Sequence, residues 1–329
     1  MARRNHSTET KLMSPNTFFL EPVAPFRLDL TVWTLRRRPH NLIDRWDGET
    51  YRRTLIIDGI PIEVEVIQTG PPETPQIRVT VIGSPLRHDG NQAVTAALER
   101  LLGLRIDLTE FYRLAHFEAG LGSLAQRFRG MKPPRFLSVF EGVVNAIANQ
   151  QVSLTVGIHL LSRLSRSHGL AVEGVDAHAF PRPMDIATID PQALRQLGFS
   201  SLKGRAMVEL AQNSDEDYAE LEQLSTLSDD DAVARLCQLR GVGRWSAEYV
   251  LLRTLGRLNV FPGDDVGARN NLQRWLELAD PLDYDGVAQL VDRWQPYAGL
   301  IYFHLLLRGL TEAGHIKVSG DQYEEDLSR

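Results

Sequence analysis

The first part of the chain alternates between apolar and polar positions. The segments FRLDLTVWTLR (26–36), YRRTLIIDGIPIEVEVIQTG (51–70) and QIRVTVIG (76–83) carry an apolar residue at nearly every second position. A period of two is typical of strands with one buried face, and Asp58-Gly59 between two such runs is typical of a tight hairpin turn. The pattern predicts an antiparallel sheet over residues 18–80, with a helix at 91–102 packed on one of its faces.

After about residue 108 the apolar positions recur every three or four residues, which is typical of amphipathic helices. A turn-rich loop, FPRPMD, is predicted at 180–185. The predicted helices span residues 109–117, 121–128, 139–149, 154–167, 191–197, 203–213, 228–238, 245–255, 266–276, 285–297 and 299–309.

These patterns predict an α+β fold in which an N-terminal antiparallel sheet with a packed helix precedes an all-α part. The expected division is a disordered segment at 1–16, an α/β domain at 17–108, an all-α domain at 109–316 and a disordered acidic tail at 317–329.

Composition narrows the class of protein. The 329 residues are 43% hydrophobic and 24% charged, which leaves room for two cores. No apolar run is long enough to span a membrane, and the first residues, MARRNHSTETKLM, lack an apolar signal segment. We expect a monomeric, cytoplasmic and nucleoid-associated protein with no membrane partner. The single cysteine, Cys237, excludes an internal disulfide and four-cysteine zinc or iron–sulfur sites.

The net charge of −6 argues weakly against a nucleic-acid partner, because charge distribution matters more than the total. Acidic residues cluster at 215–222 and 324–326, which could lie away from a binding face. The run Arg36-Arg37-Arg38 is either a basic contact or a solvated strand end.

The stretch LRGVGRWSAEYVLL (239–252) places Gly241-Val242-Gly243 between two predicted helices. Glycine is unfavourable inside a helix, so the second helix is expected to begin after this turn. Main-chain N–H groups at that helix start could bind a DNA phosphate without reading the sequence. The alternative is a compact helical hairpin with a glycine C-cap.

The stretch NVFPGDDVGARNNL (259–272) follows, with a Pro-Gly turn and Asp265 at the head of a predicted helix. An aspartate there is an ordinary N-cap when considered alone. Together, the hairpin and the aspartate resemble the signature of the helix–hairpin–helix DNA glycosylases, and most closely the 3-methyladenine DNA glycosylase II group that removes alkylated purines. Four segments occur in the order of that family: FEGVVNAIANQQVSLTV (140–156), LRQLGFSSLKGRAMVELA (194–211), LRGVGRWSAEYVLLR (239–253) and FPGDDVGAR (261–269).

The resemblance implies the catalytic residue and the reaction. It places the catalytic carboxylate at Asp265, with Asp264 as a neighbour of unassigned role. A fixed anion stabilises the positive charge that develops on the sugar as an N-glycosidic bond breaks, and a carboxylate at a helix N-terminus is expected to stay ionised. Family members that also cut the strand have a lysine where this chain has Trp245, so the resemblance implies a monofunctional enzyme.

Trp245 and Tyr249 lie four positions apart on one helix face, and we expect them to line the base pocket, where they would stack on an alkylated purine. The alternative is a pair of core aromatics. Better-known members have further aromatics at the positions of Val266 and Leu306, so a less aromatic pocket is expected. No metal is expected, and no cofactor beyond a monovalent cation at the hairpin carbonyls.

Double-stranded DNA containing damaged bases is the implied partner. Gln151 stands where some members have a leucine that fills the gap left by the flipped base, although it could be a buried glutamine at a helix end. Lys203-Gly204 could equally form a solvated turn, and His159 and His304 are expected in the core. The residues expected to contact DNA are Gly241, Val242, Gly243, Arg244, Gln150, Gln151, Lys203 and Gly204.

The implied function is hydrolysis of the N-glycosidic bond of flipped-out 3-methyladenine- or 7-methylguanine-type bases in base excision repair. Two alternatives stay open. One is a glycosylase for an oxidised, deaminated or ethenoadduct purine, and the other is a non-catalytic helix–hairpin–helix DNA-binding protein. An aspartate beside an aromatic pair favours an enzyme, since phosphate binding requires neither.

Overall fold

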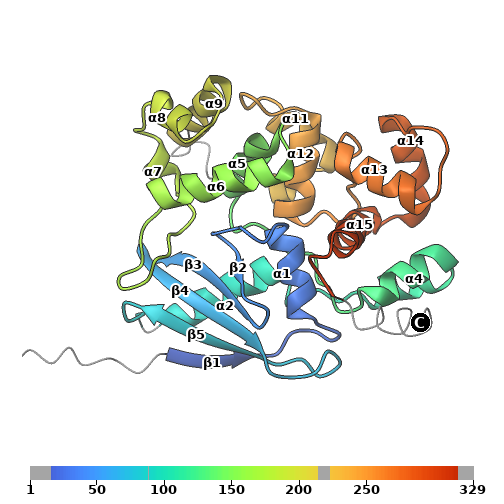
Figure 1. Ribbon diagram of the computed structural model, residues 1–329, viewed down its shortest axis with the longest axis horizontal. Helices are drawn as coiled ribbons and strands as arrows, with labels where there is room; N and C mark the ends of the chain where they lie inside the picture. The colour runs from blue at the N-terminus through green and yellow to red at the C-terminus, as the bar shows by residue number, and fades with distance from the viewer. Residues whose placement is uncertain (1–15, 88, 214–222, 318–329) are drawn as a thin grey trace, which may run out of the picture.

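The computed structural model describes residues 16–87, 89–213 and 223–317. A five-stranded antiparallel sheet lies at one end of the molecule and most of the helices gather beside it (Figure 1). The predicted α+β class is therefore confirmed. Disorder was expected at 1–16 and 317–329, and of these segments residues 1–15 and 318–329 lie outside the described residues, whereas Asn16 belongs to the first strand. The acidic clusters at 215–222 and 324–326 also lie outside the described residues.

The sheet has the order β1-β5-β4-β3-β2, with every neighbouring pair antiparallel. The predicted hairpin at Asp58-Gly59 is confirmed, since Ile57 pairs with Ile60. Both turn residues have positive φ, 51° and 79°, as a two-residue turn matching the strand twist requires. The strands are β1 Asn16–Leu20, β2 Arg45–Trp46, β3 Thr50–Ile57, β4 Ile60–Gln68 and β5 Ile77–Gly83.

The segment 26–36 is not the predicted strand but contains helix α1, Leu28–Arg36. Leu28, Val32 and Leu35 recur at helical spacing and enter the sheet core, while Leu30 on another side enters a second core. A helix covered on two sides has no polar stripe, so its sequence does not distinguish a period of two from one of 3.6. The arginines that follow are accordingly not a solvated strand end.

The remaining predicted helices are present with small shifts at their ends. Helix α5 has the predicted bounds, and Ser138 caps it by accepting a hydrogen bond from the Glu141 N–H at 3.1 Å. The helices are α2 Gly90–Leu102, α3 Thr109–His116, α4 Ala119–Arg127, α5 Val139–Asn149, α6 Leu154–His168, α7 Pro183–Ile186, α8 Pro191–Gln196, α9 Ser201–Gln212, α11 Asp229–Leu236, α12 Arg244–Val250, α13 Val266–Trp275, α14 Tyr284–Val291 and α15 Ala298–Glu312, with 3₁₀ turns η1 Gln223–Thr226 and η3 Asp292–Trp294 and a π-helical turn, η2 Leu251–Leu255.

Three helical predictions were wrong in detail. The predicted helix at 285–297 stops being α-helical after Val291 and continues only as η3, because Pro296 and its restricted preceding residue cannot extend a helix. The predicted helix at 245–255 changes to π-helical geometry at Leu251. The predicted loop 180–185 contains the start of short helix α7, whose proline occupies the first helical turn.

Two apolar clusters hold these elements together. The first joins the sheet to α5, α6, α9 and α12, and the second joins Leu30 of α1 to α3, α4, α13 and α15. Neither cluster ends at residue 108, so the predicted division into two domains there stays a prediction. Within the described ranges, no helix has the length and apolarity needed to cross a membrane.

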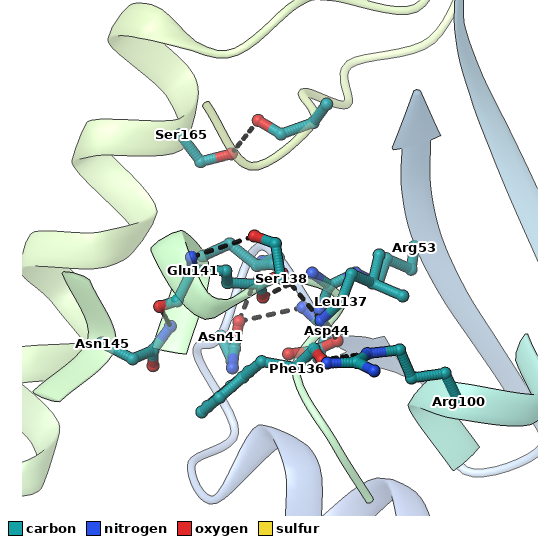
Figure 2. Close-up of polar contacts among 12 residues, drawn as sticks. Asn41, Asp44, Arg53, Arg100, Phe136, Leu137, Ser138, Glu141, Asn145 and Ser165 are labelled. Atoms are coloured by element: carbon teal, nitrogen blue, oxygen red, sulfur yellow. Dashed lines mark hydrogen bonds and ion pairs between the residues drawn. The ribbon is translucent and has the colours of Figure 1, made fainter. Parts of the chain in front are cut away.

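A buried ion-pair cluster fixes α5 to the sheet (Figure 2). Arg53 of β3 is 1% exposed, and its guanidinium contacts Asp44 at 2.7 Å and Glu141 of α5 at 2.6 Å. The Tyr51 hydroxyl also donates to Asp44, at 2.8 Å. Asn41 accepts hydrogen bonds from the Ile43 and Asp44 N–H groups and donates to the Arg36 carbonyl. The cluster therefore also fixes the loop that follows α1.

We expect Arg53→Met to lower the free energy of unfolding by about 3–5 kcal/mol, because two buried carboxylates lose their shared cation. Denaturant unfolding followed by circular dichroism measures this change. Arg113→Met is the matched control, since the ion pair of Arg113 with Glu110 is exposed and contributes little. An Arg53→Met protein as stable as the Arg113→Met protein would show that the cluster does not hold the fold together.

Candidate active site

The link between α11 and α12 is the predicted hairpin. Gly241 has φ +76°, and a β-carbon there would lie 3.2 Å from Ala206 of α9. Gly243 is the N-cap of α12 in an extended conformation open to any residue, and nothing lies within 4 Å of the position of its missing β-carbon. It offers no side-chain cap to the first turn of α12, so another molecule can approach these main-chain N–H groups closely.

The hairpin is attached to the end of α5 by Gln150. The Gln150 amide donates to the Gly241 carbonyl at 2.7 Å and to the Ser246 hydroxyl at 2.9 Å. Lys203 of α9 in turn donates to the Ala148 and Gln150 carbonyls at 3.0 and 2.6 Å. Its ammonium thus satisfies the C-terminus of α5, and its expected contact with a phosphate stays a prediction, as does that of Gly204, which is buried within α9.

Asp265 is the N-cap of α13, as predicted from its position before that helix. Its Oδ1 accepts a hydrogen bond from the Ala268 N–H at 2.9 Å. Its Oδ2 faces the pocket, 3.3 Å from Trp245 Nε1 and 3.4 Å from the Tyr302 hydroxyl, and both groups donate to it. Burial, and then the Asp265 charge, raise the pKa of Tyr302 well above its usual value, so this hydroxyl keeps its proton.

Asp264 also lines the cavity, but its carboxylate pairs with Arg244 at 2.8 Å. The Arg244 guanidinium lies 3.5 Å above the ring of Tyr284, whose hydroxyl donates to Glu248 at 2.7 Å. Gly263 packs against the same ring, where a β-carbon would lie 2.8 Å from the ring carbon. These contacts hold the loop before Asp265 against α12. Arg244 is half-exposed, and its expected contact with DNA stays a prediction.

A cavity of about 1090 Å³ opens beside Asp265. Trp245 and Tyr249 both line it, with their ring centroids 5.5 Å apart and the rings inclined by 32°. The expectation of a less aromatic pocket was wrong in one respect, because Tyr302 of α15 also lines the cavity. It lies one helical turn before Leu306, which lines the cavity too. A search of neighbouring turns on that helix would have found it.

Two arginines from the N-terminal segment reach the same cavity, and the sequence interpretation did not assign them to it. Arg37 is 4% exposed and donates to the Tyr249 hydroxyl at 2.8 Å and to Asn145 at 3.0 Å. Arg38 is half-buried and donates to Thr155 at 3.0 Å. The only sequence signal for them was the arginine run itself, since nothing local shows that a distant pocket receives it.

Gln151 is exposed, with φ +54°, so the alternative of a buried glutamine was wrong. It lines the mouth of the cavity between α5 and α6, and its role as the residue that fills the DNA gap stays a prediction. His304 is fully buried as expected, whereas His159 is exposed. Among the residues that the structure describes, no group of three or more histidine, cysteine or acidic side chains could hold a metal ion.

Comparisons with known proteins agree with this geometry. Residues 144–296 match the family model of the HhH-GPD superfamily base excision DNA repair proteins. The Bacillus subtilis (strain 168) protein named "Putative DNA-3-methyladenine glycosylase YfjP" is 30% identical over 193 residues, 58% of this chain and 67% of that protein. Escherichia coli (strain K12) DNA-3-methyladenine glycosylase 2 is 28% identical over 188 residues, 56% of this chain and 63% of that protein.

Among solved structures, the 3-methyladenine DNA-glycosylase from Archaeoglobus fulgidus superposes with a TM-score of 0.77 at 28% identity, covering 88% of this chain and 97% of that chain. The fold is that of the base excision DNA repair proteins. The chain belongs to the HhH-GPD superfamily, and the family identified from its hairpin and aspartate is confirmed.

We expect Gln150→Ala to lower the free energy of unfolding by about 1–3 kcal/mol, because the Ser246 hydroxyl and the Gly241 carbonyl lose their shared donor. Gln151→Ala is the matched control, since it changes the neighbouring exposed glutamine. Thermal unfolding of the two variants measures the difference. Equal unfolding midpoints would show that Gln150 does not hold the hairpin.

Proposed function

We propose that this protein is a monofunctional DNA glycosylase that hydrolyses the N-glycosidic bond of alkylated purines in double-stranded DNA. The observation that carries the proposal is the placement of Asp265, with one carboxylate oxygen satisfied by its own helix and the other directed to an aromatic cavity. The names of the relatives support the substrate class, and the superfamily supports the reaction.

In this proposal the damaged nucleotide leaves the duplex and its base enters the cavity, where Trp245 and Tyr249 supply aromatic surfaces for stacking. The sugar then lies near Asp265. As the bond from C1′ to the base nitrogen breaks, its electron pair leaves with the base and the sugar becomes positively charged. The Asp265 carboxylate stabilises this charge more than the ground state, and a water molecule attacks C1′.

The hairpin supplies the hold on the DNA backbone. The open main-chain N–H groups at the start of α12, the positive end of that helix and the half-exposed Arg244 suit a phosphate, and they need no particular base sequence. Gln151 at the cavity mouth is placed to enter the space that the base leaves. A monomer suffices for this assignment, because every residue in it comes from one chain.

We expect no strand cleavage, because the described residues of the cavity supply no amine nucleophile. A strand-cutting glycosylase needs an amine that can form an imine with the sugar. No lysine is among the described residues that line the cavity, and Trp245 occupies the relevant hairpin position. No cofactor is required by this reaction. A monovalent cation at the hairpin would share the Gly241 carbonyl with Gln150.

Duplexes with a single 3-methyladenine are expected to yield free base and an abasic site, with both strands intact until alkali is added. Denaturing gels with and without alkali measure this outcome, and undamaged duplex is the control. A covalent protein–DNA complex trapped by borohydride would contradict the monofunctional assignment. Release of no base from any alkylated duplex would overturn the proposed function.

Asp265→Asn is expected to lower the single-turnover rate of base release by about a hundredfold or more, the scale of losing one fixed electrostatic partner. The amide keeps the Ala268 hydrogen bond but places an N–H group opposite Trp245 Nε1. Substrate binding should change little. Asp264→Asn is the matched control, because Asp264 pairs with Arg244 and not with groups of the cavity. Full activity of Asp265→Asn, or inactivity of Asp264→Asn alone, would show that the catalytic residue is misassigned.

A further inference from the structure

Arg37 is a buried cation at the wall of the cavity with no anionic partner. It follows α1 in a left-handed conformation, with φ +60°. Its side chain donates hydrogen bonds to Asn145 of α5 and Tyr249 of α12. Among the described residues no carboxylate lies within ion-pair distance of it, and its Nε is buried without an acceptor. A buried guanidinium in this state is costly, since it loses hydration without gaining a counter-charge.

A second unpaired guanidinium lies behind the same wall. Arg253 of η2 is 1% exposed, donates to the Thr34 carbonyl at 2.9 Å and has two further nitrogens without acceptors. It packs over the rings of Tyr249 and Phe303, with its Cζ 5.6 and 5.3 Å from their centroids. The Tyr249 side of the cavity is therefore positive, whereas the Asp265 side is negative.

The Tyr249 hydroxyl keeps a proton that it can donate to a ligand in the cavity. Because it accepts a hydrogen bond from Arg37, its own proton must point elsewhere, and no acceptor for that proton occurs in the described part of the chain. Tyr249 and Arg37 thus present donors and no acceptor. A base edge that presents a carbonyl oxygen as acceptor fits these donors.

Resting on the proposed function, we propose that Arg37 is a base-recognition residue that selects neutral purines with a carbonyl oxygen on the edge facing Tyr249. When the bond between C1′ and N9 of such a base breaks, the electron pair stays on the base, and the resulting negative charge spreads to the carbonyl oxygen. Arg37, directly and through Tyr249, stabilises this anion while Asp265 stabilises the sugar cation. Water then adds to C1′, its proton passes to solvent, and the released purine anion takes up a proton.

The proposed role of Arg37 predicts that two kinds of damaged base depend on it differently. A cationic alkylpurine departs as a neutral molecule, so it needs no stabilisation of negative charge and gains nothing from Arg37. A neutral oxopurine departs as an anion and depends on it. The release rates of the two kinds of base can be measured separately with the same enzyme.

The experiment compares single-turnover release of three bases from otherwise identical duplexes: hypoxanthine, the analogue purine with hydrogen in place of the carbonyl, and 3-methyladenine. The wild-type protein should release hypoxanthine at least about tenfold faster than the carbonyl-free purine, since a site that donates to an acceptor discriminates against its loss. Arg37→Met should bring this ratio close to one, and its release rate should fall more on hypoxanthine than on 3-methyladenine. Arg37→Lys should restore part of the ratio.

Arg38→Met is the matched control, because it removes the adjacent guanidinium at the half-buried mouth of the cavity. It should weaken DNA binding and leave the ratio unchanged. Equal losses on all three bases in Arg37→Met, with the ratio preserved, would overturn the inference in favour of a structural role. If Arg37→Met does not fold, the test is the ratio of hypoxanthine release to release of the carbonyl-free purine by the wild-type protein. A ratio near one overturns the inference, and a ratio of about ten or more supports it.

The proposed function is tested separately by the third base. Release of 3-methyladenine with a hypoxanthine ratio near one overturns the role of Arg37 and supports the alkylpurine assignment. Release of hypoxanthine at the expected ratio without release of 3-methyladenine supports Arg37 and overturns that assignment.

Discussion

The contact of Arg53 with both Asp44 and Glu141 is the interaction on which the remaining architecture depends. It joins strand β3 of the sheet, the loop after α1 and the first turn of α5 through one buried side chain. The same loop presents Arg37, and the same helix presents Asn145 and ends at the glutamine that holds the hairpin. A displacement of the sheet relative to α5 would thus move both the cavity wall and the hairpin between α11 and α12.

The site divides electrostatically along the bond that would break. In the proposed reaction, Asp265 supplies negative charge beside the sugar, and the guanidinium groups behind Tyr249 supply positive charge beside the base. Between them the rings of Trp245 and Tyr249 line the cavity. Charges of opposite sign fixed before substrate arrives need little rearrangement as charge separates, which is why such an arrangement suits glycosidic bond cleavage.

Local sequence information was sufficient where local chemistry determines structure. The Ser138 cap and the apolar spacing define α5, two residues with positive φ define the β3–β4 hairpin, and the glycine hairpin with its following aspartate defines the family. Local sequence information was insufficient where tertiary contacts determine the conformation of a segment or the partner of a side chain. Helix α1 is buried on two sides and so lacks a polar stripe, and nothing near Arg37 in the sequence shows that Tyr249 receives it. Tyr302 lies one helical turn before the position on α15 that the family resemblance indicates, so the sequence pattern did not assign it to the cavity.

The residues that line the cavity come from separate parts of the sequence. The matched family region, residues 144–296, contains the hairpin and Asp265 but not Arg37. The reaction machinery and one wall of the cavity are therefore encoded by separate stretches of the gene. A substitution confined to the N-terminal stretch can therefore change the charge of one cavity wall while the sequence of the hairpin and Asp265 stays the same, so the two parts of the site can be varied independently in engineered chimeras.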